Sequence, residues 1–414
     1  MVVWTVAAEQ ARLGHQVGLL VTSPPDDAAQ QHARERGIDL MHFPVSHWRF
    51  DEAVGPALIV EPATDVVHFH SVFIPHQATL ARDLRRWGMP YVVTPHGGLM
   101  PQVLARGRWK KLAYSALVER ARIRSAAAIA YVTPGGEADI RRFVPDFDGP
   151  VRWVPNPVDV ERLSAVGWRP RGPRPRLIFL GRFDVYHKGL DRLAEIARRV
   201  SDADFQLFGV NDPKTQRQLD VIRRCAPPNL STNSPIFEQD KLDALAHSTM
   251  YIQVSRWEAL SISILEALAL GVPCVISESM SMAAMFREHD LGLVVSTQAD
   301  LAAFQIRDAL ANPERLMRWS ETARAYAREH ASPEAVARSI MEVYEEAVAH
   351  HYSARVMRLA AALERNGKGG DTPARLVEQS EQEDGNTKKL ESFLDRSDRR
   401  VEKASDPLPL GDDT

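Results

Sequence analysis

Short apolar runs alternate with longer segments of helical periodicity along most of the 414-residue chain. Several runs are apolar almost without a break, such as MYIQVS at 250–255 and PCVIS at 273–277, which is typical of strands covered on both faces. Regular alternation of strands and helices indicates parallel sheets. The predicted strands lie at 16–22, 38–45, 65–71, 90–96, 128–133, 151–155, 176–182, 204–210, 250–255, 273–277 and 291–296.

A linker rich in proline and arginine, GWRPRGPRPR, divides this pattern into two halves. The alternation restarts after it, so we predict two doubly wound α/β domains joined near residues 165–175. The first domain is expected over 1–165 and the second over 172–330. A last helical pattern closes the folded part, and we expect this helix, over 331–352, to pack back on the first domain.

Both ends of the chain depart from the strand–helix pattern. From about Gly367 charged residues dominate and apolar ones become scarce, so we predict a disordered charged tail over 367–414, with a docking segment that folds on a partner as the alternative. The first residues have helical spacing that ends at Gly14, whereas a doubly wound domain starts with a strand and a tight glycine turn. We therefore expect an N-terminal strand to be missing, with the natural product beginning upstream.

Composition narrows the class of protein. Hydrophobic residues make up 44% of the chain, enough for sizeable cores, yet no apolar run is long enough to span a membrane. There are only two cysteines, which argues against a disulfide scaffold and fits a reducing, cytoplasmic environment. The net charge of -3 gives no indication of nucleic-acid binding, and we expect no nucleic-acid partner.

Two carboxylates interrupt the apolar segment SRWEALSISILEALALGVP at 255–273. The helical spacing of this segment places Glu258 in the loop after a strand and Glu266 inside the following helix. Ligands of open parallel sheets bind at the carboxyl ends of strands, so both acids could line one crevice and accept hydrogen bonds from a sugar or a ribose. The alternative is that both are ordinary exposed acids on a solvated surface.

Two cations follow an earlier strand of the second domain. In RLIFLGRFDVYHKGLDRL, Arg182 stands at the end of the strand and Lys188 at the start of the next helix. Helix N-termini favour anions, and arginine and lysine add direct charge, so this arrangement predicts a diphosphate clamp. The alternative is two exposed side chains on a loop.

Together these motifs resemble the signature of the retaining GT-B glycosyltransferases of family 4, the glycosyl transferases group 1. The shared features are Gly-Arg before a loop and Lys-Gly, then two glutamates separated by seven residues, then Gly-x-Pro. The resemblance covers roughly residues 1–350 and implies a GT-B fold, in which two Rossmann-like domains face a cleft. The first domain would bind the acceptor and the second the nucleotide sugar.

The resemblance also implies roles for the residues of the second domain. Arg182 and Lys188 would grip the donor diphosphate, Glu258 would contact the donor sugar as a catalytic residue, and Glu266 would bind the ribose. The family's loop after the first glutamate offers backbone N–H groups to the phosphates, which assigns donor diphosphate binding to Leu260 and Ser261. This chain has alanine, leucine and serine in that loop where many relatives have glycines.

In the first domain the resemblance concerns three loops. The strand VVTP is followed by His96, which the family would place near the transferred sugar as a catalytic residue; a turn histidine is the alternative. The segment WVPNPVD resembles the family's Pro-Asn-Gly-Val-Asp, with proline in place of the glycine. Further cleft residues are expected at Gly97, Gly98, Glu137 and Asn156.

The resemblance implies neither a metal nor a cofactor, since the family's donor clamp uses side chains and backbone in place of a divalent ion. The nucleotide diphosphate sugar enters as substrate. His68 and His70 share one face of a predicted strand, which leaves a structural pair and a metal pair as alternatives.

The segment 82–124 is basic and carries Trp87, Trp109 and Tyr114 among its arginines and lysines. Such a segment could contact an anionic membrane surface or a lipid-diphosphate acceptor, giving peripheral attachment at the inner membrane face. The alternative is a solvated helix face beside an acceptor cleft.

The leading hypothesis is retaining transfer of a sugar from a nucleotide diphosphate sugar to a glycan or lipid-linked acceptor, in cell-surface polysaccharide biosynthesis. Fixed cations would stabilise the charge that grows on the leaving group. The alternatives are a nucleotide-sugar epimerase or phosphorylase on the same fold, and a non-catalytic subunit that binds nucleotide sugars. A nicotinamide dehydrogenase is disfavoured because no G-x-G-x-x-G follows a strand. The donor sugar, its base and the acceptor stay open.

Overall fold

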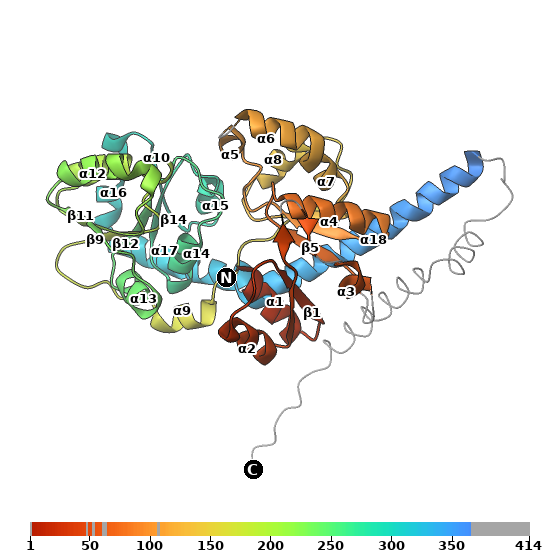
Figure 1. Cartoon of the computed structure of the whole chain (residues 1–414). Helices are drawn as coiled ribbons and strands as arrows, with labels where there is room; N and C mark the ends of the chain where they lie inside the picture. The colour runs from red at the N-terminus through yellow and green to blue at the C-terminus, as the bar shows by residue number, and fades with distance from the viewer. Residues whose placement is uncertain (1, 47–48, 52–53, 60–63, 106–107, 366–414) are drawn as a thin grey trace, which may run out of the picture.

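The computed structural model describes residues 2–46, 49–51, 54–59, 64–105 and 108–365. They form two α/β lobes, with one long helix running from the second lobe beneath the first (Figure 1). The tail predicted over 367–414 lies outside the described residues.

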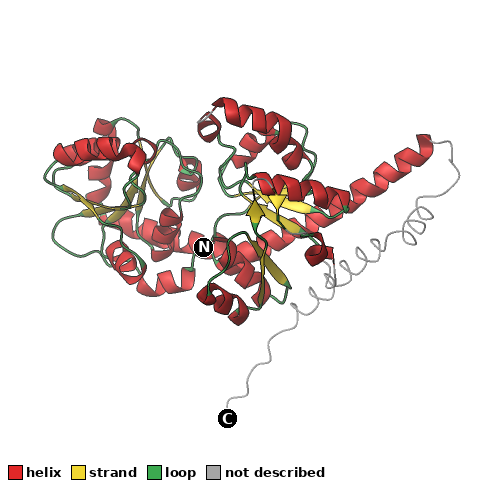
Figure 2. Ribbon diagram, in the orientation of Figure 1, coloured by secondary structure: helices red, strands yellow, loops and turns green. Residues whose placement is uncertain are grey.

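The second lobe contains a parallel six-stranded sheet with helices on both faces (Figure 2). Its order, β11-β10-β9-β12-β13-β14, places β9 and β12 side by side at its centre, where the strand order reverses. The strands are β9 Arg176–Leu180, β10 Asp204–Phe208, β11 Leu230–Asn233, β12 Met250–Gln253, β13 Cys274–Ser277 and β14 Gly292–Val295. The helices are α10 Val185–Lys188, α11 Leu190–Arg199, a 3-10 turn Pro213–Thr215, α12 Gln216–Arg224, α13 Glu238–Ala246, α14 Ile262–Leu270, α15 Ala283–Glu288, α16 Ala299–Leu310 and α17 Pro313–His330.

The first lobe contains two parallel sheets and a small antiparallel pair. The larger sheet, in the order β5-β6-β7-β8, consists of β5 Val67–His70, β6 Tyr91–Thr94, β7 Ala128–Tyr131 and β8 Val151–Trp153. The smaller sheet pairs β1 Val17–Val21 with β2 Ile38–His42, and the antiparallel pair is β3 Val45–Ser46 with β4 Arg49–Phe50. Within the described ranges, no strand pairing joins β1 and β2 to the larger sheet.

Helices cover both faces of the first lobe. They are α1 Val2–Arg12, α2 Asp27–Glu35, α3 Gly55–Ile59, α4 Pro75–Arg86, α5 Pro101–Ala105, α6 Arg108–Tyr114, α7 Arg120–Arg124 and α8 Gly136–Phe143, whereas α9 Val160–Val166 packs against α13, α14 and α17 of the second lobe. A π-helical turn, Ser115–Glu119, lies between α6 and α7. Glu119 and Arg122 form a buried ion pair there, and Arg122 also donates to the carbonyl of Ser71, which ties this segment to the end of β5.

The long last helix, α18 Pro333–Arg365, belongs to the core of the first lobe. It follows a chain crossing at which the amide of Val158 donates to the carbonyl of Ala331. Val336, Ile340 and Val343 then recur at helical spacing and pack against β6 and β7, so that α18 covers one face of the larger sheet. The helix continues past residue 352, where the predicted helix ended. No helix in the described part of the chain is long and apolar enough to cross a bilayer.

Most predicted strands coincide with observed ones, but β3 was predicted only as the end of the run 38–45, and β4 and β11 were not predicted. Both β4 and β11 are short, and β11 forms one edge of the six-stranded sheet with a single buried residue, Leu230. Edge strands need little apolar surface, so their sequences give a weak periodic signal.

Candidate active site

Glu258 lies in the loop after β12 and is held in place by two short contacts, with a third, longer hydrogen bond from Ser255 Oγ. The ammonium Nζ of Lys188 lies 2.5 Å from Glu258 Oε2, and Nε2 of Gln253 donates to the same oxygen at 2.7 Å. The side chains of Lys188 and Glu258 are only 15% and 14% exposed. The alternative of a solvated loop acid is therefore excluded for Glu258.

Gln253 is the buried anchor of this loop. Its amide oxygen accepts from the hydroxyls of Tyr251 and Ser261, each at 2.9 Å, while its NH2 group reaches Glu258. The amide thus joins the end of the strand to the glutamate and to the start of α14. The sequence analysis missed this residue, although a lone glutamine in the apolar strand MYIQ was an available signal.

The position of Lys188 depends on a tight approach of two loops. Lys188 was expected at the start of a helix, but it is the last residue of the short helix α10. Gly189 follows in the left-handed conformation with φ 67°, before α11 begins at Leu190. A Cβ on Gly189 would stand 2.3 Å from the carbonyl oxygen of Val254, so only glycine fits. The amide of Arg256 donates to the carbonyl of His187 at 2.9 Å, which fastens the two loops together.

Arg182 is placed differently from Lys188. Its side chain is 58% exposed, and its Nε lies 3.7 Å from Asp212. Across the described residues it makes no ion pair with the Lys188–Glu258 cluster. The predicted clamp thus consists of one cation fixed in the cluster and one that remains exposed at the carboxyl end of β9.

Glu266 is paired with a residue that the sequence analysis did not single out. Lys241 of α13 places its Nζ 2.7 Å from Glu266 Oε1, and the two side chains are 24% and 12% exposed. Glu266 is therefore a partly buried, ion-paired acid, and the alternative of an exposed helix acid is excluded.

In the loop between Glu258 and α14, two carbonyls are bound by a side chain of the protein and the amides are not. Ser281 Oγ donates to the carbonyls of Glu258, at 2.5 Å, and Ala259, at 3.1 Å, so the carbonyl side of the loop faces the protein. No hydrogen bond from the amides of residues 259–261 to another described residue is present. Free amides at the start of a helix form a site for an anion.

On the first lobe, His96 stands at the end of β6 beside two further histidines. Its Nε2 lies 3.0 Å from Nδ1 of His70, whose ring stacks on His68 with centroids 4.2 Å apart. His68 uses both ring nitrogens, one with Tyr344 at 2.8 Å and one with Thr94 at 2.7 Å. These contacts describe a structural histidine stack, and no cluster suited to a metal ion occurs among residues that the structure describes.

Burial keeps this histidine stack uncharged. Desolvation lowers the pKa of His70 to about 3, and the neighbouring His96 acts in the same direction. Desolvation also lowers the pKa of His68 and of His96 below the ordinary value. His96 thus faces the cleft as a neutral ring that can donate or accept a hydrogen bond.

The two lobes meet at the glycines after His96. A Cβ added to Gly97, which has φ 75°, would lie 2.5 Å from Cβ of Ala259. Gly98 is equally confined, because its Cβ would lie 2.3 Å from Cγ2 of Val72. The loop after Glu258 therefore touches the His96 turn directly.

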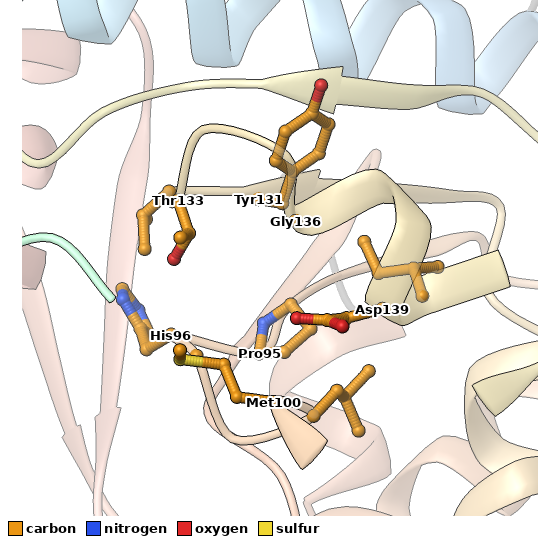
Figure 3. Close-up of a pocket in the computed structure, with 11 residues that line it drawn as sticks. Pro95, His96, Met100, Tyr131, Thr133, Gly136 and Asp139 are labelled. Atoms are coloured by element: carbon orange, nitrogen blue, oxygen red, sulfur yellow. The ribbon is translucent and has the colours of Figure 1, made fainter. Parts of the chain in front are cut away.

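Beside this contact lies a hollow lined by residues from the ends of β6 and β7 and from α8 (Figure 3). We call it the Thr133 hollow. Its lining residues are Pro95, His96, Gly97, Leu99, Met100, Tyr131, Val132, Thr133, Gly136, Asp139 and Ile140.

Three expected cleft residues, Gly98, Glu137 and Asn156, lie outside the lining of the Thr133 hollow. Glu137 is 47% exposed and pairs with Arg141 at 3.3 Å, because the period of α8 turns Gly136 and Asp139 inward and Glu137 outward. Asn156 is buried at the crossing between the lobes, and its Oδ1 has no partner among the described atoms.

Comparison with known proteins assigns the family. Residues 1–157 match the model of the glycosyl transferase 4-like domain, and residues 166–326 match that of the glycosyl transferases group 1. The chain belongs to the glycosyl transferases group 1 family. The resemblance inferred from the Glu258–Glu266 and Arg182–Lys188 motifs is thus confirmed.

Relatives of this group 1 chain are identical to it at about a quarter of the aligned residues. It is 26% identical to a GDP-mannose:cellobiosyl-diphosphopolyprenol alpha-mannosyltransferase of Xanthomonas campestris over 60% of this chain and 65% of the relative, so it spans less than two thirds of that protein. It is 24% identical to the alpha-maltose-1-phosphate synthase of Mycolicibacterium smegmatis, over 68% and 79% of the two chains.

The fold of this group 1 protein is also found in solved structures. Sucrose-phosphate synthase from Thermosynechococcus elongatus matches with a TM-score of 0.65 at 17% identity, over 83% of this chain and 92% of that chain. The predicted GT-B arrangement of two parallel α/β domains is confirmed.

Proposed function

We propose that this protein transfers a sugar from a nucleotide diphosphate sugar to a hydroxyl group of a glycan or lipid-linked acceptor, with retention of configuration. The observation that carries the proposal is the Lys188–Glu258 pair beside the free amides of residues 259–261, opposite the neutral His96. A cation and amides suit a diphosphate, and a carboxylate and an imidazole suit sugar hydroxyls.

The donor diphosphate is held by Lys188, by the amides at Leu260 and Ser261, and by the exposed Arg182. These groups sit where negative charge develops as the sugar leaves, which is where fixed positive charge lowers the barrier. Glu266 accepts hydrogen bonds from the ribose hydroxyls. Metal-independent transfer belongs to the same proposal, because these groups supply the charge stabilisation at the phosphates.

In the reaction the bond between the sugar's anomeric carbon and the phosphate oxygen breaks, and the acceptor oxygen bonds to that carbon from the same face. The acceptor proton passes to the departing phosphate oxygen. Glu258 is tied to Lys188 and Gln253 and serves as a hydrogen-bond acceptor for the sugar, while His96 contacts the sugar from the other lobe.

A lipid-linked acceptor at the inner membrane face fits the exposed surface of the first lobe. The side chains of Trp109, Leu112 and Leu117 are 74%, 63% and 80% exposed. The π-helical turn after α6 changes the helical period, so that these three residues lie on one side of the helical segment. The exposed arginines 82, 85 and 86 lie in the same basic segment. One relative is named for a diphosphopolyprenol acceptor, which supports this class of acceptor. A role in cell-surface polysaccharide biosynthesis in the cytoplasm belongs to the same proposal.

Donor binding and transfer are tested in sequence. A thermal-shift panel of UDP- and GDP-sugars is expected to raise Tm with one donor class, because a ligand that binds only the folded state stabilises it. NMR of the product formed on a polyprenyl-diphosphate glycan is then expected to show the donor's anomeric configuration. Inversion excludes retention. Nucleotide-sugar binding without transfer to any acceptor supports the non-catalytic alternative.

The membrane part of the proposal has a separate test. Vesicles containing phosphatidylglycerol are expected to sediment the protein at low salt, and the double variant Trp109→Ser/Leu117→Ser is expected to stay in solution. Phe304→Ser, which changes an exposed apolar residue of the second lobe, serves as the control. Equal sedimentation of all three proteins contradicts this membrane assignment.

A further inference from the structure

We propose that the Thr133 hollow is a subsite for a hydroxyl or hydroxymethyl group of a sugar, with Thr133 and Asp139 as its binding residues. The inference rests on the proposed function, because it adds a contact to the same cleft. It concerns residues that the family motifs in the sequence did not identify.

The hydroxyl of Thr133 is the first observation. Thr133 is 4% exposed, and its Oγ1 is buried without a hydrogen-bond partner among the described atoms. Its side chain points into the hollow towards His96 (Figure 3). A buried hydroxyl without a partner destabilises the fold, so its presence at the wall of a cleft indicates a ligand that supplies the missing bond.

Asp139 is the second observation, and it enters the same hollow from α8 (Figure 3). Its side chain is 22% exposed, and Arg142 uses one carboxylate oxygen, Oδ1, at 3.0 Å. The other oxygen keeps its capacity to accept hydrogen bonds. A carboxylate repels phosphate, so the charge of this wall favours the hydroxyl-bearing part of a substrate over its phosphate groups.

The remaining walls fit a sugar as well. Pro95, Leu99, Met100 and Ile140 supply apolar surface, and His96 adds a neutral ring at the mouth. Few polar groups on an apolar wall are typical of small-molecule sites. The hollow is small, with about 20 Å³ open to a group the size of a water molecule, which is room for a single hydroxyl group of a sugar.

The hydroxyl group that binds in the Thr133 hollow belongs either to the donor sugar or to the acceptor sugar. Both pass close to His96 in the proposed reaction, and the contact between Gly97 and Ala259 places the hollow next to the donor loop. The test therefore measures three affinities: that of the free nucleotide diphosphate, that of the nucleotide diphosphate sugar, and that of methyl hexosides observed by NMR in the presence of the nucleotide.

Thr133→Val and Asp139→Asn are compared with the wild type and with Glu137→Gln, a matched change on the outward face of α8. Affinity for the free nucleotide is expected to stay unchanged in all variants. Thr133→Val and Asp139→Asn are expected to lose about three- to tenfold or more in affinity for one sugar probe, as the removal of a hydrogen bond predicts. Loss with the nucleotide sugar assigns the hollow to the donor, and loss with a methyl hexoside assigns it to the acceptor.

Stability separates this role from a structural one. Since Oγ1 of Thr133 has no partner, Thr133→Val is expected to keep or raise Tm while it weakens sugar binding. Unchanged binding of both sugar probes overturns the proposal. The proposal is also overturned if the wild-type protein binds the free nucleotide but gains no affinity from the sugar of the nucleotide sugar and binds no methyl hexoside; the donor diphosphate site then still stands. If the wild-type protein binds no nucleotide at all, the proposed function itself is refuted.

Discussion

The ammonium of Lys188 lies 2.5 Å from the carboxylate of Glu258, so two groups from different loops of the second lobe hold each other. In the proposed reaction they have different partners, a phosphate for Lys188 and a sugar hydroxyl for Glu258. The pair therefore makes it possible to separate binding of the nucleotide from transfer of the sugar.

Lys188→Met is expected to weaken binding of the nucleotide diphosphate by about ten- to a hundredfold, since a charge-assisted hydrogen bond contributes about 1.5–3 kcal/mol. Isothermal titration with UDP and GDP measures this loss. The exposed Lys214→Met is the matched control and should bind like the wild type. Nucleotide affinity that is equal in Lys188→Met and in the control would refute the clamp.

Glu258→Gln is expected to leave nucleotide affinity within about threefold of the wild type and to lower transfer by about a hundredfold or more, a loss typical of a group that acts in the transition state. Single-turnover transfer with a saturating donor measures the effect. A parallel fall in affinity for the free nucleotide would move Glu258 from the sugar to the diphosphate.

Lys241 is expected to position Glu266 for the ribose. Lys241→Met leaves a partly buried carboxylate without its partner, which should lower Tm and reduce the preference for a nucleotide diphosphate over its 2′,3′-dideoxy analogue. Lys241→Arg is expected to restore part of both. A drop in Tm with an unchanged preference would show that the Lys241–Glu266 pair is only structural.

The histidine stack predicts a loss of stability in acid. The pKa of His70 is about 3 in the folded protein and near 6.5 in the unfolded chain, so between these values the unfolded chain binds more protons. Stability therefore falls as pH decreases through this window, by about 1.4 kcal/mol per pH unit for one such group. His70→Asn should flatten the dependence of Tm on pH.

The control for this prediction is His32→Gln, which changes an exposed histidine. It should reproduce the wild-type dependence on pH. A wild-type slope in His70→Asn would mean that His70 titrates alike in the folded and unfolded states.

Gly97 and Ala259 are expected to be coupled across the two lobes. Gly97→Ala introduces a Cβ that is 2.5 Å from Ala259 and a side chain at φ 75°, so Tm and transfer should both fall. Ala259→Gly removes the clash but not the backbone strain, so the double variant should recover only part of the loss. A double-mutant cycle measures the coupling, and additive effects would show that the loops do not meet in solution.

The sequence predicted the sheets well because their strands are buried on both faces. Apolar runs such as RLIFLGR and MYIQVS are compatible with few elements other than a buried strand. The strand β11 carries only one buried residue and was not predicted. The placement of Glu258 and Glu266 was also predictable, since the end of the strand and the helix period fix it.

Contacts between distant segments were not predictable. Lys241 meets Glu266 only because α13 packs beside α14, across 25 residues of sequence. On α8 the acid that faces the cleft is Asp139 rather than Glu137, a matter of helix phase that the short pattern GEADI did not settle. The partner of each side chain is a property of packing, which periodicity does not encode.

The packing of α18 has a consequence for synthesis on the ribosome. One face of β6 and β7, with Val92, Ala128 and Ala130, is covered by Val336, Ile340 and Val343, which are translated after the whole of the second sheet. The lobe that leaves the ribosome first therefore completes its core last, and its sheet stays exposed to chaperones while the second lobe folds.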